Sequence, residues 1–345
     1  MSETKIDSMA STVAALLAPG KGILAADESF PTIGKRFAAL SILSTEANRR
    51  NYRELLFSTP GLIEAISGAI LFDETLHQEA STGVSLPETL ARQGIIPGIK
   101  VDGGTVALAN FPNEKITQGL DGLRERLDAY YKLGARFTKW RAVIVIGEGV
   151  PTGTGVWANA ESLARFAALS QEAGLVPIVE PEILMDGNHP LARCEEVATA
   201  TLQGVFERLS AHRVVLELML LKTGMILPGT DCRDQADVDA IAGATVRCLT
   251  RAVPATVPGI VFLSGGQSDV EATARLNAIC QRRGGAPWTL SFSFGRALQD
   301  APMKTWRGTV GNAPAAQAAL RHRAKCNGLA VLGKYSDQVE RDIAV

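Results

Sequence analysis

The stretch Val214-Val215-Leu216-Glu217-Leu218-Met219-Leu220-Leu221-Lys222 places a lysine at the end of an almost entirely apolar run. Such a run is too apolar to lie on a surface, so it predicts a buried strand that ends at Lys222. Removing water from an ammonium group is costly unless a partner or loss of the proton compensates. Lys222 is therefore either neutralised by a neighbour or adapted for chemistry as a neutral amine. The alternative is a lysine whose stem packs while its head reaches solvent.

Further apolar or β-branched runs lie on both sides of this stretch. With it they make eight predicted strands, at residues 22–26, 69–72, 95–101, 137–146, 176–182, 214–221, 259–263 and 288–294. Helical periodicity is found before the first strand and between most of the others, at residues 6–17, 120–133, 158–173, 194–209, 237–252, 270–283 and 313–326. Strands that alternate with helices are typical of a parallel sheet.

The number of these units indicates the architecture. Eight strand–helix units without a linker rich in Gly, Ser or Pro favour one closed (β/α)8 (TIM) barrel over two open sheets. We therefore expect an α/β protein with a single barrel domain over residues 1–345, an extra N-terminal helix and a short tail at 336–345. A doubly wound dinucleotide-binding fold is the competing interpretation, but no predicted strand runs into G-x-G-x-x-G.

Composition narrows the functional classes. The net charge is −1 and no run rich in Lys or Arg is present, which argues against a nucleic-acid partner. No apolar run approaches the length of a membrane span, and the patch at 13–18 is too short for a signal-peptide core. The cysteines are odd in number and far apart, so we expect reduced thiols and a cytoplasmic location. They are Cys194, Cys232, Cys248, Cys280 and Cys326.

Polar residues stand at the ends of the predicted strands, where a (β/α)8 barrel places its chemistry. They are Asp27-Glu28-Ser29, Lys100-Val101-Asp102, Lys139-Trp140-Arg141, Glu180-Pro181-Glu182, Lys222, Ser264-Gly265-Gly266-Gln267 and Ser293-Phe294-Gly295-Arg296. Alternation along a strand makes Lys139 and Arg141 point the same way, and likewise Glu180 and Glu182. A structural ion-pair network would explain any one pair, but so many charges at one rim favour an active site.

This set of side chains suits carbonyl chemistry. A neutral lysine amine adds to a ketone and, with an acid to expel water, gives a protonated imine that accepts electrons when a nearby bond breaks. Lys222 would supply the amine, Glu180 the acid and base, and Asp27 the base for a distant hydroxyl. Lys139, expected on the adjacent strand, would favour the neutral amine through like-charge repulsion, while Glu180 and Glu182 compensate the charge.

Two groups of residues are candidates for binding anions. Ser264-Gly265-Gly266 and Gly295-Arg296 follow the seventh and eighth strands, where barrels of this kind bind phosphate, although a Gly-Gly turn alone is more often an ordinary turn. A second anion site on the opposite side would be formed by Ser29, Lys35, Arg36, Lys100 and Arg141. A substrate with a phosphate at each end and a ketone between would fit both.

Seven motifs, in this order along residues 22–335, together resemble class I fructose-bisphosphate aldolase. They are Gly22-Ile23-Leu24-Ala25-Ala26-Asp27-Glu28-Ser29, Gly98-Ile99-Lys100-Val101-Asp102, Lys139-Trp140-Arg141, Val179-Glu180-Pro181-Glu182, Leu220-Leu221-Lys222, Phe262-Leu263-Ser264-Gly265-Gly266-Gln267-Ser268 and Phe292-Ser293-Phe294-Gly295-Arg296-Ala297-Leu298. The resemblance implies a (β/α)8 barrel, commonly a homotetramer, that needs no cofactor or metal. It also implies reversible cleavage of fructose 1,6-bisphosphate into dihydroxyacetone phosphate and glyceraldehyde 3-phosphate.

The resemblance also assigns roles to residues of this chain. Lys222 would form the Schiff base and Asp27 would deprotonate the hydroxyl on the fourth carbon. Glu180 would be the acid and base of imine formation, supported by Lys139 and Glu182. The phosphate nearest the ketone would be held by Ser264, Gly265 and Arg296, and the far one by Ser29, Lys100 and Arg141.

Several positions depart from the family pattern. Thr223-Gly224 replaces Pro-Asn, Phe294 replaces a tyrosine, and Phe30-Pro31-Thr32 replaces a serine-containing turn, although Thr32 keeps a hydroxyl. The tail ends in Val345 rather than in the tyrosine of the animal enzymes, and its polar content is typical of a solvated terminus. We therefore expect Glu180 or water to protonate the enamine.

Other functions fit the sequence less well or remain open. A metal-dependent aldolase fits poorly because no histidine falls at ligand spacing from another; the four are His77, His189, His212 and His322. A non-catalytic sugar-phosphate sensor or scaffold would keep the phosphate-binding residues but would not need Lys222, Glu180 and Asp27. A Schiff-base aldolase that prefers sedoheptulose 1,7-bisphosphate or fructose 1-phosphate remains open.

Overall fold

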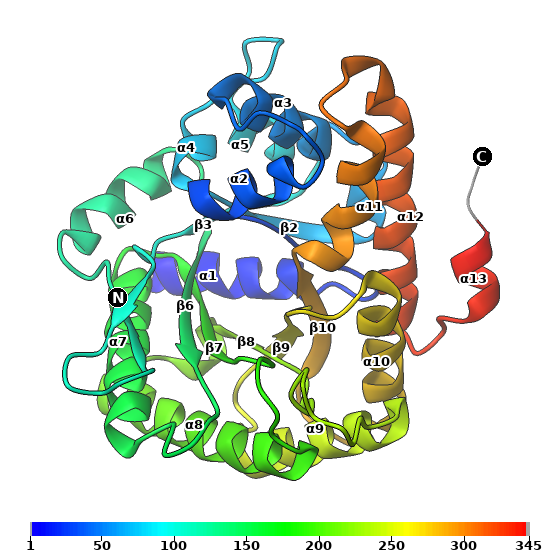
Figure 1. The fold of residues 1–345 in the computed structure, drawn as a ribbon. Helices are drawn as coiled ribbons and strands as arrows, with labels where there is room; N and C mark the ends of the chain where they lie inside the picture. The colour runs from blue at the N-terminus through cyan, green and yellow to red at the C-terminus, as the bar shows by residue number, and fades with distance from the viewer. Residues whose placement is uncertain (1, 343–345) are drawn as a thin grey trace.

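Eight parallel strands close into a barrel in the computed structural model, which describes residues 2–342 (Figure 1). Their order around the barrel is β1-β10-β9-β8-β7-β6-β3-β2. The bounds are β1 Gly22–Ala26, β2 Ile66–Leu71, β3 Ile96–Lys100, β6 Phe137–Ile144, β7 Val176–Ile183, β8 Leu220–Thr223, β9 Gly259–Phe262 and β10 Thr289–Phe294. The predicted (β/α)8 barrel is confirmed.

Helices surround the barrel, and α1 covers one of its ends (Figure 1). Their bounds are α1 Glu3–Leu16, α2 Phe30–Ala38, α3 Glu46–Phe57, α4 Asp73–Leu76, α5 Leu86–Ala91, α6 Leu123–Lys132, α7 Gly153–Glu172, α8 Leu191–Ala211, α9 Val238–Ala252, α10 Asp269–Arg282, α11 Arg296–Trp306, α12 Ala313–Val331 and α13 Asp337–Arg341. A hairpin of β4 Thr105–Ala107 and β5 Lys115–Thr117 lies between β3 and α6.

The sequence patterns missed the helices α2 to α5 and α11. Helix α3 is mostly polar, so its apolar periodicity is weak, but its start carries a local signal. The Thr45 hydroxyl accepts a hydrogen bond from the Asn48 backbone N–H at 3.1 Å, and Glu46 stands in the first turn. Ser, Thr, Asp and Asn are the residues that satisfy the free N–H groups at a helix start. Capping chemistry, rather than periodicity, would have located this helix.

The predicted strand at 214–221 is wrong in its first half. Leu216–Leu218 forms a 3₁₀ helix, and β8 begins only at Leu220. The side-chain amide of Gln171 on α7 holds this turn, because it accepts from the Val215 N–H at 2.9 Å and donates to the Val215 carbonyl at 2.8 Å. An apolar run alone does not distinguish strand from other buried backbone. Lys222 consequently lies within β8 rather than after it.

Helix α1 closes the end of the barrel at which the strands begin. Met9, Val13 and Leu16 of this helix pack with inward-facing strand residues in one buried apolar cluster. The Ser67 hydroxyl at the start of β2 donates a hydrogen bond of 2.7 Å to the Leu16 carbonyl. A Cβ atom on Gly259, the first residue of β9, would lie 2.4 Å from Leu17. The extra N-terminal helix therefore fills the floor of the barrel.

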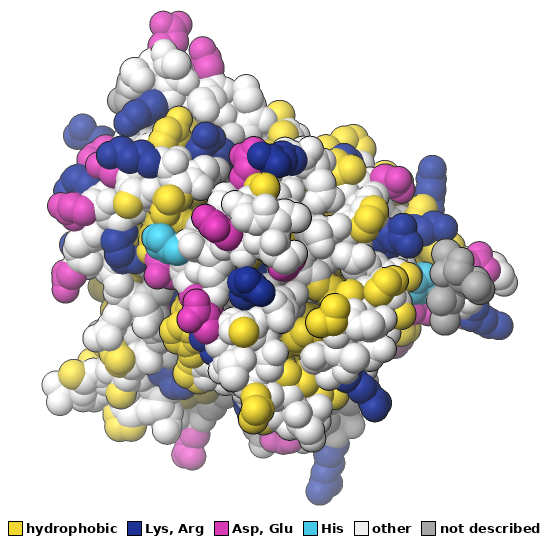
Figure 2. All heavy atoms as spheres, turned by 90° about the horizontal axis from the view of Figure 1, so that it is seen from above, with side chains coloured by type: hydrophobic (Ala, Val, Ile, Leu, Met, Phe, Trp, Pro, Cys, Tyr) yellow, Lys and Arg dark blue, Asp and Glu magenta, His cyan; other side chains and the backbone are white. Residues whose placement is uncertain are grey.

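On the face drawn in Figure 2, basic and acidic side chains are interspersed. In the part of the chain that the structure describes, no helix combines the length and apolar character needed to cross a membrane.

Candidate active site

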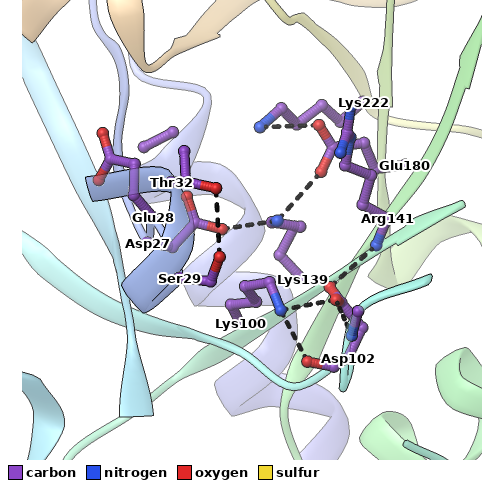
Figure 3. Close-up of polar contacts among 12 residues, drawn as sticks. Asp27, Glu28, Ser29, Thr32, Lys100, Asp102, Lys139, Arg141, Glu180 and Lys222 are labelled. Atoms are coloured by element: carbon purple, nitrogen blue, oxygen red, sulfur yellow. Dashed lines mark hydrogen bonds and ion pairs between the residues drawn. The ribbon is translucent and has the colours of Figure 1, made fainter. Parts of the chain in front are cut away.

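Four side chains form a continuous series of ion pairs inside the barrel, three from strands β6, β7 and β8 and one from Asp27, directly after β1 (Figure 3). The Lys222 Nζ atom lies 3.1 Å from Glu180 Oε1, and Lys139 Nζ lies 3.4 Å from Glu180 Oε2. Lys139 Nζ also lies 2.6 Å from Asp27 Oδ2. The side chains of Lys139, Glu180 and Lys222 are each 4% exposed. The residues that the sequence assigned to carbonyl chemistry are thus brought together and shielded from water.

The prediction that Lys139 and Lys222 stand on adjacent strands is wrong. Lys139 stands on β6 and Lys222 on β8, and β7 lies between these strands. Glu180 of β7 occupies the space between the two amines and pairs with both. The amines are therefore bridged by a carboxylate, and Lys139 is not on the strand adjacent to Lys222.

Neighbouring charges determine the protonation state of Asp27 and Lys139. Burial by itself favours the neutral acid of Asp27, but Lys139 and Lys222 outweigh it and lower the pKa of Asp27 to about 2. Burial also disfavours the charged form of Lys139, yet Asp27 and Glu180 raise the pKa of that amine above its usual value. Asp27 is therefore a carboxylate and Lys139 an ammonium ion at neutral pH, whereas Lys222 has one carboxylate partner.

Two buried polar atoms on residues that face the barrel interior make no hydrogen bond among the described residues. They are Glu180 Oε2 and the hydroxyl oxygen of Ser293 on β10. Ser293 pairs in register with Ile23, which belongs to the cluster inside the barrel, so it also faces the interior. Buried polar atoms without partners commonly mark the place of a ligand or water. Sequence analysis gave Ser293 no role, although strand alternation from a buried neighbour would have identified it.

Two further ion pairs involve residues of β3, β6 and β7 and the segment after β3. Arg141 Nε contacts Glu182, and this carboxylate raises the pKa of Arg141 although partial burial opposes the charged form. The Arg141 side chain remains 42% exposed. Lys100 Nζ lies 2.6 Å from Asp102 Oδ1 and donates to the Asp102 carbonyl at 2.7 Å. Glu182 thus pairs with Arg141, rather than with either buried lysine.

The predicted phosphate-binding turns meet at the ends of β9 and β10. The Arg296 guanidinium donates a hydrogen bond to the Gly265 carbonyl, and Ser264 is buried. Gly265 has φ of +57°, a left-handed conformation that glycine adopts without strain. Gly295 precedes the first turn of α11, and no side chain caps that helix start. Free N–H groups at a helix start and a forked guanidinium suit a phosphate.

The second predicted anion site is only partly supported by the geometry. Ser29 and Thr32 have hydroxyl oxygens 3.2 Å apart, and Lys35 on α2 is exposed. Arg36 differs from the expectation, because its guanidinium binds the carboxylates of Glu28 and Asp300. A cation already paired with two acids is a poor candidate for an anion, so the structure gives Arg36 a scaffolding position.

That scaffold contains residues that sequence analysis missed. Glu28 also accepts from Arg53 of α3 at 2.6 Å and from the Gln299 amide at 2.8 Å. Arg53 is 3% exposed. A buried arginine on a helix is a signal in itself, since arginine is almost never fully buried without a partner. Helix α3 was not predicted, and the signal was missed with it.

Comparison with known proteins identifies this arrangement. The family model of class I fructose-bisphosphate aldolase matches residues 8–344. A probable fructose-bisphosphate aldolase class 1 of Xylella fastidiosa is 56% identical, over 96% of this chain and 99% of its own. Cytosolic fructose-bisphosphate aldolase 4 of Arabidopsis thaliana is 52% identical, over 93% of this chain and 82% of its own.

The fold gives the same answer. A crystal structure of fructose-bisphosphate aldolase from Plasmodium falciparum, in complex with TRAP and a small-molecule inhibitor, superposes with a TM-score of 0.95. It is 47% identical, and the match covers 97% of each chain. The chain is therefore a lyase that belongs to the class I fructose-bisphosphate aldolase family.

Proposed function

We propose that Lys222 is the amine that forms a Schiff base with the ketone during reversible cleavage of fructose 1,6-bisphosphate into dihydroxyacetone phosphate and glyceraldehyde 3-phosphate. The observation that carries this proposal is the buried chain Lys222, Glu180, Lys139 and Asp27. Lys139 is held as an ammonium ion between two carboxylates, so it is a poor nucleophile. Lys222 is the last residue in this series of ion pairs, and its Nζ atom lies 3.1 Å from Glu180 Oε1.

Glu180 is the proposed acid and base of imine formation. Its Oε1 atom is within hydrogen-bond reach of the reacting amine, so it can give the proton that expels water from the carbinolamine. Its Oε2 atom has no hydrogen-bond partner among the described residues. The same group is then the nearest protein donor for protonation of the enamine. Lys139 holds Glu180 in place, while Glu182 positions Arg141 one layer above.

Asp27 is the proposed base that removes the hydroxyl proton when the carbon–carbon bond breaks. Its pKa of about 2 keeps it ionised, but also makes it a weak base. Lys222 is one of the three amines that lower this pKa, together with Lys139 and Lys100. Bond cleavage converts the charged iminium on Lys222 to a neutral enamine, which removes that positive charge. The basicity of Asp27 therefore rises in the step in which it takes the proton.

The two phosphates are assigned to opposite sides of the mouth. Ser264, Gly265, Gly266, Gly295 and Arg296 bind the phosphate beside the ketone. Ser29, Thr32, Lys35, Lys100 and Arg141 bind the far one, with Lys100 and Arg141 exchanging the carboxylates of Asp102 and Glu182 for the incoming phosphate. This arrangement supports a bisphosphate substrate. We propose a preference for fructose 1,6-bisphosphate over sedoheptulose 1,7-bisphosphate because the relatives are named as fructose-bisphosphate aldolases.

Assembly and location are also proposals. We propose a single-domain subunit that forms a homotetramer, the assembly that the family resemblance implies. We also propose that the protein acts in the cytoplasm, since the Arabidopsis relatives are named as cytosolic.

Borohydride trapping tests the central assignment. Reduction in the presence of dihydroxyacetone phosphate should inactivate the enzyme and attach the three-carbon fragment to Lys222, because a protonated imine is reduced to a stable amine. Peptide mass mapping locates the tag, and Lys222→Met should abolish it. Lys100→Met, at the rim, is the control that should still be tagged at Lys222. A tag on Lys139 or Lys100 in the unmodified sequence would contradict the proposal.

A further inference from the structure

Three potential metal ligands meet on the outer side of the barrel, where α13 lies against α12 (Figure 1). His322 and Cys326 are four residues apart on α12, so their side chains lie on the same face of the helix. Glu340 comes from α13. One ligand atom from each of these residues lies within 4.8 Å of the other two. Sequence analysis compared only histidines with one another and therefore overlooked this spacing.

The distance between the first two ligand atoms suits zinc. Cys326 Sγ lies 3.6 Å from His322 Nε2. In a tetrahedral zinc site, a sulfur at about 2.3 Å and a nitrogen at about 2.0–2.1 Å from the metal are separated by about 3.5–3.6 Å. Cys326 is fully buried and His322 half-buried, so the pair is partly shielded from water. The two side chains on α12 are already at the separation that the metal requires.

Glu340 can supply a third ligand without losing its present partners. Its carboxylate accepts from Arg323 and from the Tyr335 hydroxyl, the latter at 2.7 Å. A carboxylate offers about four acceptor positions, so two remain. The charge of Arg323 is shared with Thr273, to which it donates at 2.7 Å, and with the Asp269 carboxylate at 3.8 Å. The positive charge beside the cluster is thus compensated by two carboxylates, that of Glu340 in direct contact and that of Asp269 at 3.8 Å.

We propose that His322, Cys326 and Glu340 form a structural zinc site that fixes α13 to α12, with water as the fourth ligand. Zinc binds the lone pair of His322 Nε2 with the ring proton on Nδ1, and the Cys326 thiol loses its proton to solvent. His322 Nε2 lies 3.1 Å from the Glu340 carbonyl oxygen. A thiolate, an imidazole and a carboxylate form a ligand set that zinc favours.

The zinc site is separate from the active site. Gly328, two residues beyond Cys326 on α12, packs so closely on Gly20 that a Cβ atom there would lie 2.5 Å from the Gly20 carbonyl oxygen. Gly20 precedes β1, so the C-terminal end of α12 lies at the end of the barrel where the strands begin. None of the three ligands belongs to the proposed active site, and a chelator should leave aldol cleavage unchanged.

Metal titration of the full chain tests the proposal. Chelator-treated protein should bind one equivalent of Zn²⁺ in equilibrium dialysis, and Co²⁺ should give the absorption of a cobalt–thiolate bond. Cys326→Ser and His322→Ala should each weaken binding by at least about tenfold, since even changes to outer-shell partners have effects of about 10- to 100-fold. Cys232→Ser is the control, because Cys232 is a more exposed thiol that an adventitious metal would reach first.

The rate of trypsin cleavage in α13 tests whether the metal fixes this helix. Arg341 is exposed in α13, and Zn²⁺ should slow trypsin cleavage there in the unmodified sequence but not in Cys326→Ser. Binding that survives both α12 variants, binding that follows Cys232, or absence of a cobalt–thiolate band would each overturn the proposal. Because steady-state cleavage is measured separately, failure of the zinc site would leave the Lys222 assignment intact.

Discussion

The interior of the barrel has an apolar layer and a charged layer, built by the same strands two residues apart. The inward-facing pairs are Phe137 and Lys139 on β6, Ile178 and Glu180 on β7, and Leu220 and Lys222 on β8. The first residue of each pair packs in the apolar cluster with α1, and the second residue takes part in the series of ion pairs. Alternation by two along a strand brings both to the same side of the sheet.

The comparison shows how one scaffold supports two kinds of layer. The apolar layer is stabilised by burial and close packing, in which every atom finds a neighbour. The charged layer is stabilised only because Lys139 lies between Asp27 and Glu180. Glu180 Oε2 makes no hydrogen bond among the described residues, although Lys139 Nζ lies 3.4 Å from it. The apolar layer should therefore determine the stability of the fold, and the charged layer should determine the rate of the reaction.

The largest expected effect is on the charged layer. Asp27→Asn should reduce carbon–carbon cleavage by about 10²- to 10⁴-fold, because an amide cannot take the hydroxyl proton. Imine formation should persist, since Lys222 and Glu180 keep their contact. Single-turnover cleavage and borohydride tagging measure the two steps separately. Glu180→Gln is the matched variant and should slow tagging itself; near-normal cleavage by Asp27→Asn would place the base elsewhere.

A deletion in the apolar layer should act in the opposite way. Phe137 is fully buried, and Phe137→Ala should lower the free energy of unfolding by about 3–5 kcal/mol. The folded fraction should still form the imine, because the charged layer keeps its partners. Urea unfolding measures the first effect and tagging the second. Phe137→Leu, which leaves a smaller cavity, should lose less stability; a loss below about 1 kcal/mol for the alanine variant would contradict the division of roles.

The rim above the charged layer should affect substrate binding more than either stability or chemistry. Arg296→Ala should raise KM for fructose 1,6-bisphosphate and fructose 1-phosphate alike, by about 10- to 100-fold, since hydrogen bonds to charged groups contribute about 1.5–3 kcal/mol. Lys100→Ala should weaken mainly the bisphosphate. Steady-state kinetics with both substrates distinguish the sites, and equal damage by Lys100→Ala on fructose 1-phosphate would refute the two-site arrangement.

The smallest expected effect concerns acid stability. The pKa of Asp27 is lowered from 3.8 to about 2 in the folded chain, so its ionised form stabilises the fold above pH 3.8. That contribution, about 2 kcal/mol, should be lost as pH falls toward 2. Urea unfolding across this range measures it. Asp27→Asn and Lys139→Met should both flatten this part of the pH profile, and an unchanged slope would mean that the ion pair does not stabilise the fold.

Much of the fold and the candidate site followed from local pattern. Strands that alternate with helices predicted the barrel, and alternation along β6 and β7 predicted that Lys139 points the same way as Arg141, and Glu180 the same way as Glu182. The charged ends of the strands indicated Asp27 and Lys222. Each of these is a property of a few consecutive residues, so the chain carries it without reference to distant contacts.

The remaining features depend on contacts between distant segments. The start of β8 is set by Gln171 of α7, and the separation of Lys139 from Lys222 depends on β7 lying between their strands. The tail was expected to be a solvated terminus, yet α13 pairs Glu340 with Arg323 of α12; residues 343–345 lie outside the described residues.

The sequence by itself determined which chemical groups are present and which side of each strand carries them, because alternation and apolar content are local. Only the tertiary structure decided which charges pair. Arg36 is bound by Glu28 and Asp300, and Glu180 lies between two lysines, because strand order and helix packing bring these residues together. The energy of an ion pair depends on distance and burial, and neither quantity is a property of the sequence pattern.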